Sequence, residues 1–155
     1  MIVIAGGEGD TMQPLSCDHL LMSVPQLDKQ HRELIAEVNE FSAAVEAGAS
    51  RAEVELRVTR LIEDFQVHFD SEERLMQSSR FPELAPHVDE HRKLIAQMTG
   101  LRDGLDSGGV QLCDALVLFV RLWAEQHISG LDRTFAQFLG DGNARAGSGS
   151  STTGQ

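Results

Sequence analysis

Residues 50–76 read SRAEVELRVTRLIEDFQVHFDSEERLM. Ser50 stands three residues before Glu53, which is the spacing of a capping box and predicts that a helix begins here and runs to about residue 79. His68 and Glu72 lie four residues apart and continue the apolar face of this helix, so it is predicted to turn polar side chains toward the core. The apolar residues of that face are Val54, Val58, Leu61, Ile62, Phe65, Phe69, Leu75 and Met76.

The same helical period recurs in three further segments, residues 28–48, 88–105 and 110–140. Asp28 is predicted to cap the first of them, and residues 106–109, Asp-Ser-Gly-Gly, are predicted to end the third. No segment alternates polar and apolar residues as a strand would. The sequence therefore predicts an all-α protein, an antiparallel up-down four-helix bundle over residues 22–140.

The two ends of the chain lack this period. Residues 1–21 are predicted to form an irregular N-terminal arm that folds back onto the bundle, and residues 141–155, rich in Gly, Ser and Thr, a disordered tail. His19 is expected to be exposed or packed within the arm, and Cys113 to pack inside a helix. Cys17 and Cys113 lack C-x-x-C spacing, which argues against a disulfide framework or a thiolate zinc site and favours a reducing cytoplasm.

Composition narrows the classes of partner. A chain of 155 residues with 41% hydrophobic residues can bury the core of one domain. A net charge of −11 without a dense Lys/Arg cluster argues against a nucleic-acid partner. The apolar start, residues 1–5, is short and has no basic residue before it, so neither membrane insertion nor export is expected and the cytoplasm is the predicted location.

Five of the six histidines and two carboxylates fall at helix-spaced positions. Residues four apart, such as His87 and His91, share one helix face. Burying such groups in one core without a cation would cost several kcal/mol, so a buried metal site is predicted. The donors are too many for one tetrahedral zinc, which indicates two metals; thiolate-free imidazole ligation suits iron, copper, zinc or nickel, and bridging carboxylates favour iron. The candidate ligands are His31, His68, Glu72, His87, His91, His127 and Asp132.

His127 and Asp132 stand five residues apart, which an ideal helix rotates by about 140°. A local distortion such as a π-bulge is therefore predicted at residues 128–131, with Gly130 easing its strain. Glu73, beside Glu72, is expected to face solvent on another side of its helix.

Four stretches carry a resemblance to a known family. They are VPQLDKQH at 24–31, HFDSEE at 68–73, HVDEH at 87–91, and WAEQHI at 123–128 followed by Asp132. Together they resemble the hemerythrin family, specifically its single-domain bacterial members, over residues 22–139. The resemblance implies reversible dioxygen binding for storage, transport or sensing, and a binding protein rather than an enzyme.

The resemblance also implies a di-iron centre with an oxo or hydroxo bridge. One iron would take His87, His91 and His127, the other would take His31 and His68 and keep an open position, and Glu72 and Asp132 would bridge the two irons.

Hydrophobic residues matching the wall of the family's oxygen pocket are Leu34, Trp123, Ala124 and Ile128. Ala124 stands where the family often carries a larger aliphatic residue, which suggests a roomier pocket and a shorter-lived oxygen adduct. The approach to the first helix also lacks the aromatic residues common in the family.

Other functions remain open at this point. A di-iron oxidase or peroxidase, or an enzyme handling nitric oxide or peroxide, is the main alternative; a metal-free interaction bundle is a third. A ferritin-like site is disfavoured because no histidine has a glutamate three residues before it, and zinc hydrolysis because His-Glu-x-x-His is absent. Dioxygen is the expected ligand, a redox or oxygen-consuming protein is compatible as a partner, and the oligomeric state is left open. With no output domain evident, oxygen carriage is favoured over sensing.

Overall fold

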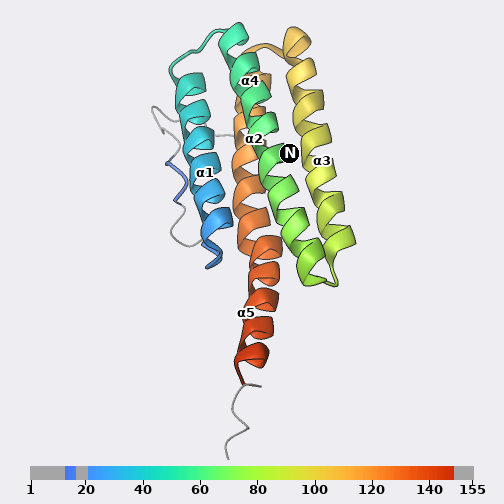
Figure 1. The fold of residues 1–155 in the computed structure, drawn as a ribbon. Helices are drawn as coiled ribbons and strands as arrows, with labels where there is room; N and C mark the ends of the chain where they lie inside the picture. Colours follow the sequence, from blue (N-terminus) through green and yellow to red (C-terminus); the bar gives the residue numbers. More distant parts are fainter. Residues whose placement is uncertain (1–12, 17–20, 149–155) are drawn as a thin grey trace, which may run out of the picture.

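The computed structural model describes residues 13–16 and 21–148; for residues 106–112 and 143–148 it describes the backbone only. It contains, in chain order, α1 (Pro25–Glu46), α2 (Arg51–Ser79), α3 (Leu84–Asp103), α4 (Leu105–His127), the π-helical turn η1 (Ile128–Asp132) and α5 (Arg133–Ser148). The part of the chain so described has no strand, which confirms the all-α prediction. α4, η1 and α5 follow one another directly and form one long rod whose last part extends beyond the other helices (Figure 1).

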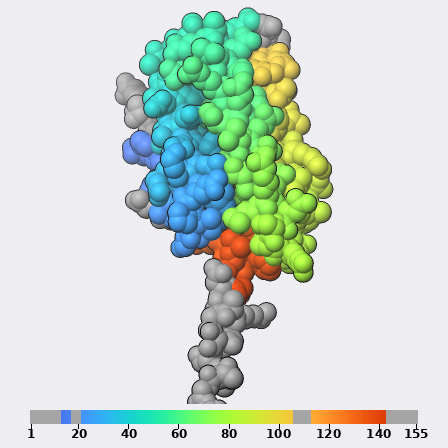
Figure 2. Space-filling view, viewed as in Figure 1, coloured from blue at the N-terminus to red at the C-terminus, as the bar shows by residue number. Residues whose placement is uncertain are grey.

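The helices close into a four-helix bundle. α1 packs against α2 and α4, α3 packs against α2 and α4, and short connections make neighbours in the chain antiparallel (Figure 1). Figure 2 shows α1 and α2 in tight contact along one face, with α5 emerging below them. The main core fills the upper part of the bundle and includes Val38, Phe41, Val58, Phe65 and Leu94. These residues are almost fully buried, so the bundle is held mainly by apolar burial from all its helices.

A second apolar cluster closes the lower end of the bundle. It joins the start of α1, the end of α2 and the start of α5 through Met22, Leu27, Met76, Phe81 and Phe135. The rings of Phe81 and Phe135 lie 5.0 Å apart between centroids. The space between the two clusters is where the polar residues of the core lie.

The predicted capping box is present, because the Ser50 hydroxyl accepts a hydrogen bond from the backbone N–H of Glu53 at 3.3 Å. The prediction that Asp28 caps α1 is wrong. The helix begins earlier, at Pro25, whose missing N–H is no loss at that position. Asp28 lies buried in the first turn and instead accepts a hydrogen bond from the N–H of Met22 at 2.6 Å.

Further helix boundaries also differ from expectation. α3 begins at Leu84 rather than at residue 88, with Pro86 in its first turn, where its missing N–H is no loss. α3 ends at Asp103 and α4 begins at Leu105, so residues 106–109 are helical rather than a turn. Leu105, 3% exposed, anchors this first turn in the core. The last helix continues past Gly140 to Ser148, since extending an existing helix costs far less than starting one. Residues 149–155 of the expected tail lie outside the described residues.

The described part of the N-terminal arm lies against the bundle. Leu15 exchanges two hydrogen bonds with the side chain of Asn39 on α1. Cys113 packs against the main core cluster, as predicted, and burial raises the pKa of its thiol. Cys17 and His19 fall outside the described residues. Among the helices of the described part, none is long and apolar enough to cross a lipid bilayer.

Candidate metal centre

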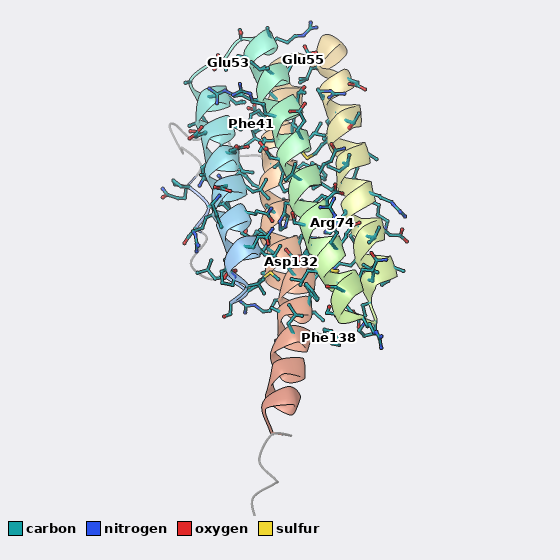
Figure 3. The ribbon with its side chains drawn as sticks, viewed as in Figure 1. Phe41, Glu53, Glu55, Arg74, Asp132 and Phe138 are labelled. Atoms are coloured by element: carbon teal, nitrogen blue, oxygen red, sulfur yellow. The ribbon has the colours of Figure 1, made fainter. Side chains whose placement is uncertain are left out.

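All seven candidate ligands meet inside the lower half of the bundle. They come from α1, α2, α3, α4 and η1, and none exposes more than the 5% of His127. Figure 3 shows Asp132 in the middle of the bundle, between the helices rather than on their outer faces. The sequence prediction that these side chains point inward is therefore correct for each of them: His31, His68, Glu72, His87, His91, His127 and Asp132.

Their donor atoms form two groups, each within 4.8 Å. The five-residue group consists of Glu72, His87, His91, His127 and Asp132. The three-residue group consists of His31, His68 and Asp132. Asp132 belongs to both groups, so its carboxylate is the link between two adjacent cation positions.

The donor atoms of each group approach one another closely. The Nε2 atoms of His31 and His68 lie 3.1 Å apart, and those of His91 and His127 lie 3.0 Å apart. Two imidazole lone pairs at this separation need a proton or a cation between them. His87 Nε2 lies 3.1 Å from Asp132 Oδ1, which adds a carboxylate to the same point.

Several of these buried atoms have no hydrogen-bond partner among the described residues. They include both carboxylate oxygens of Glu72, both of Asp132, and Nε2 of His87. Each unsatisfied buried polar group costs about 1–3 kcal/mol, and charged ones cost more. Metal cations would satisfy all of these atoms, and imidazole and carboxylate donors without thiolate suit iron and other first-row transition metals. The residues present therefore fit a metal centre.

The predicted helix distortion is present as η1, Ile128–Asp132. It allows His127 and Asp132 to face the same point although five residues separate them, with His127 Nε2 at 3.0 Å from Asp132 Oδ1. The Gly130 carbonyl accepts a hydrogen bond from the Thr134 hydroxyl at 3.0 Å. The expected role of Gly130 is not borne out, because its φ is not positive and an added Cβ would meet nothing within 4 Å.

Without metal, the two groups hold protons differently. Burial disfavours a charge on His87, but the nearby carboxylates of Asp132 and Glu72 outweigh it and raise the pKa of His87 to about 9. Burial and the neighbouring His31 lower the pKa of His68 to about 4. Burial would raise the pKa of Asp132, yet the nearby His127 holds it well below its usual value. At neutral pH the five-residue group thus stores a proton that a metal must displace.

Two of the histidines have partners on their outer nitrogens. His91 Nδ1–H donates to Glu73 Oε1 at 2.8 Å, so the prediction that Glu73 only faces solvent is wrong; it is 30% exposed and reaches across to α3. His68 Nδ1–H donates to Gln30 Oε1 at 3.2 Å. Gln30 in turn donates to the Ser71 hydroxyl at 3.1 Å. Because a ligating histidine needs an acceptor for its second N–H, polar residues beside a ligand could have been suspected from the sequence.

The predicted wall residues lie in two apolar clusters of the bundle. Leu34 belongs to the main core, and Ala124 and Ile128 form a small separate cluster with Ile35. Trp123 packs against both clusters and stacks on the His127 ring, with centroids 4.2 Å apart and planes at 16°.

Two further neighbours of these residues, one aromatic and one aliphatic, were not predicted from the sequence. Phe69 stacks on the His91 ring at 3.7 Å between centroids and 8° between planes. Ile35 completes the cluster of Ala124 and Ile128. Both lie on apolar helix faces, where their positions match core residues equally well, so no signal in the sequence distinguished them.

A surface pocket of about 310 Å³ lies between α1 and α2 and reaches His68. Its mouth is acidic, since Glu33, Glu37 and Asp64 line it together with Gln30, Leu34, Val67 and His68. Both groups border surface pockets, because two others, of about 380 Å³ and 260 Å³, reach His91 and His87.

Comparison with known proteins agrees with this geometry. A family model described as the hemerythrin HHE cation binding domain matches residues 22–139. The chain is 30% identical over 112 residues to a bacteriohemerythrin of Methylococcus capsulatus, which covers 72% of this chain and 85% of that protein. It is 29% identical over 106 residues to a myohemerythrin of Sipunculus nudus, covering 68% of this chain and 77% of that protein.

Solved structures show the same fold. A crystal structure of a leucine-to-alanine variant of hemerythrin superposes with a TM-score of 0.73 at 27% identity and covers 83% of this chain and 98% of that one. A leucine-to-tyrosine variant gives the same TM-score at 26% identity, with the same coverage. From the buried histidine and carboxylate cluster, the matching family model and these relatives, the chain belongs to the hemerythrin family of HHE cation-binding domains.

Proposed function

We propose that this protein binds dioxygen reversibly at a non-heme di-iron centre and serves oxygen storage or delivery rather than turnover. The observation that carries the proposal is the unequal number of histidines in the two groups: three in one and two in the other, with Asp132 common to both. A metal in the three-residue group has fewer protein donors, so it retains a position for an external ligand.

The candidate ligands have three roles in this proposal. His87, His91 and His127 would hold one iron, and His31 and His68 the other. When bound, a pair of ferrous ions would supply the two electrons that dioxygen takes. Asp132 would hold the two positions at a fixed separation, and Asp132 and Glu72 would balance the metal charge.

The apolar wall favours release of dioxygen over irreversible oxidation. Leu34, Ala124 and Ile128 are buried, and the Trp123 ring covers His127. Walls of this kind exclude water and spare protons, which are the species that would convert a reversible complex into the oxidised resting protein.

The test is an optical titration of anaerobically reduced protein, with iron counted per chain. A visible charge-transfer band that appears with air and disappears under argon, at two irons per chain, supports the proposal. Asp132→Asn should remove both the iron and the band, whereas Asp70→Asn, on the exposed face of α2, should keep them. A band that persists under argon, or direct oxidation with peroxide consumed, would favour the oxidase or peroxidase alternative.

A further inference from the structure

A short piece of the N-terminal arm is fixed across the seam between α1 and α4. The backbone N–H of Leu15 donates to Asn39 Oδ1 at 2.8 Å, and the Leu15 carbonyl accepts from Asn39 Nδ2 at 3.0 Å. One side-chain amide therefore satisfies both backbone groups of a residue 24 positions away. A paired contact of this kind fixes the orientation of Leu15 as well as its position.

Arg121 on α4 ties the same segment from the other side. Its guanidinium donates to the Gln13 carbonyl and, at 3.4 Å, to Asn39 Oδ1. Asn39 and Arg121 together thus join the arm, α1 and α4, and we call these two residues the latch. Residues 13–16 run beside α1 in Figure 1.

The latch holds the Leu15 side chain over the predicted oxygen pocket. Leu15 packs against the cluster of Ile35, Ala124 and Ile128 and also against the main core. The two latch residues share helix faces with members of this cluster. Asn39 lies one helical turn beyond Ile35, and Arg121 lies three residues before Ala124.

The small size of Ala124 makes this contact important. An alanine at a helix seam leaves space that a larger aliphatic side chain would fill, yet Ala124 is only 1% exposed. Leu15 supplies apolar volume at this seam from outside the four helices. Residues 13–16 also precede the segment that matches the family model, residues 22–139, so this covering is not contributed by the matched domain.

We propose that Leu15 is a wall residue of the oxygen pocket, held in place by the Asn39–Arg121 latch, and that it limits the access of water and small molecules to the site. Asn39 acts as a positioning residue, since it touches the arm and not the ligating atoms. The consequence for dioxygen rests on the proposed function, whereas the closure of the seam does not.

Trp123 offers a direct readout of this closure. It is the only tryptophan, the chain has no tyrosine, and its ring packs against the same two clusters as Leu15. The experiment uses the full chain loaded with Zn²⁺, which is redox-inert. Quenching of Trp123 fluorescence by acrylamide and by dissolved dioxygen is measured for the parent protein and for Leu15→Ala, Asn39→Ala and Asn39→Asp.

Both alanine variants should increase quenching. Each hydrogen bond that a variant of Asn39 loses is expected to raise the fraction of molecules with a released arm about fivefold. Asn39→Asp keeps the acceptor for Leu15 and Arg121 but loses the donor, so it should lie between the parent and Asn39→Ala. Leu56→Ala, an equal truncation at a site 57% exposed on α2, is the matched control and should leave quenching unchanged.

Equal quenching in Leu15→Ala, Asn39→Ala and the Leu56→Ala control, with helical circular dichroism retained, would overturn the proposal. The iron-loaded proteins then separate this proposal from the function itself. Faster autoxidation in Leu15→Ala, alongside increased quenching, supports both. Increased quenching in a protein that forms no oxygen complex would support the role of Leu15 and reject reversible dioxygen binding. Unchanged quenching in a protein that binds dioxygen reversibly would support the function and reject the role of Leu15.

Discussion

The five-residue and three-residue groups share Asp132 but differ in what surrounds their imidazoles. In the five-residue group, His91 donates to the carboxylate of Glu73 and lies flat against Phe69. In the three-residue group, His68 donates to the neutral amide of Gln30. An anionic acceptor makes a ligating imidazole more basic than a neutral one does.

This contrast shows that similar ligands can produce two unequal metal positions. The ligand types are the same on both sides, namely imidazole and carboxylate. The partners behind them set the basicity of each imidazole, and the number of protein donors sets how many positions remain for an external ligand. The five-residue group therefore offers a metal more protein donors than the three-residue group does.

Removing the shared ligand should have the largest effect. Asp132→Asn is expected to reduce iron at both positions, whereas His68→Ala should leave about one iron per chain, because the five-residue group remains complete. The loss of bound metal should lower the melting temperature of the Asp132→Asn protein by about 10 °C. Elemental analysis and thermal unfolding test this; loss of only one iron in Asp132→Asn would show that the two positions do not depend on a common carboxylate.

Exchanging the outer partners should make the two groups more alike. Glu73→Gln removes the anionic acceptor of His91 and should weaken metal affinity at the five-residue group about tenfold or more. Gln30→Glu places a carboxylate behind His68 and should lower the reduction potential of the metal in the three-residue group. Chelator competition and potentiometric titration measure these effects. A potential that moves equally at both positions in either variant would contradict this assignment.

The metal-free protein should show the contrast as opposite pH dependences. Since the pKa of His87 is raised from 6.5 to about 9, its stabilisation is complete below pH 6.5 and is lost as the pH rises to about 9. The pKa of His68 is lowered from 6.5 to about 4, so stability also falls as the pH decreases from 6.5 toward 4.

Thermal unfolding of the metal-free chain across this range tests both slopes. His87→Gln should flatten the alkaline side alone, and His68→Gln the acidic side alone. A single variant that flattens both sides would mean that the two groups titrate as one unit.

The smallest effect is expected at the acidic mouth of the pocket beside His68. Burial and a hydrogen bond with Asp64 raise the pKa of Glu37 from 4.5 to about 7, with Glu40 adding repulsion and Arg60 opposing it. Glu37 is therefore protonated in the folded protein at pH 5 and charged at pH 8. Glu37→Gln should stabilise the protein at pH 8, by less than about 1 kcal/mol because solvent screens the site, and hardly at pH 5. Denaturant titrations at both pH values test this, with the exposed Glu55→Gln as control.

The sequence predicted the bundle and the seven clustered side chains well, because both follow from helical periodicity. An apolar face and a histidine pair such as His87 and His91 repeat with the same period, so one pattern locates both. The π-helical turn was predictable for a related reason: His127 and Asp132 are five residues apart and cannot face one point in a regular helix.

What the sequence could not predict depends on contacts between distant segments. Glu73 was expected to face solvent because its angle on α2 points away from Glu72, but α3 lies on that side and presents His91. Asn39 gave no signal at all, since its partner Leu15 belongs to an irregular arm without a period. The start of α4 was misplaced because burial of Leu105 outweighs the low helix propensity of the glycines that follow.

The π-helical turn also determines which kinds of mutation the centre can tolerate. The ligand pairs on α2 and α3 are each four residues apart, which a regular helix places on one face. Each of these pairs therefore depends only on which residues occupy the two positions. The pair formed by His127 and Asp132 depends instead on the length of chain between them, since Gly130 has open space around it and no positive φ. Side-chain exchanges at Gly130 should therefore be tolerated, whereas inserting or deleting one residue there would displace Asp132 relative to His127 and, with it, the carboxylate that both groups share.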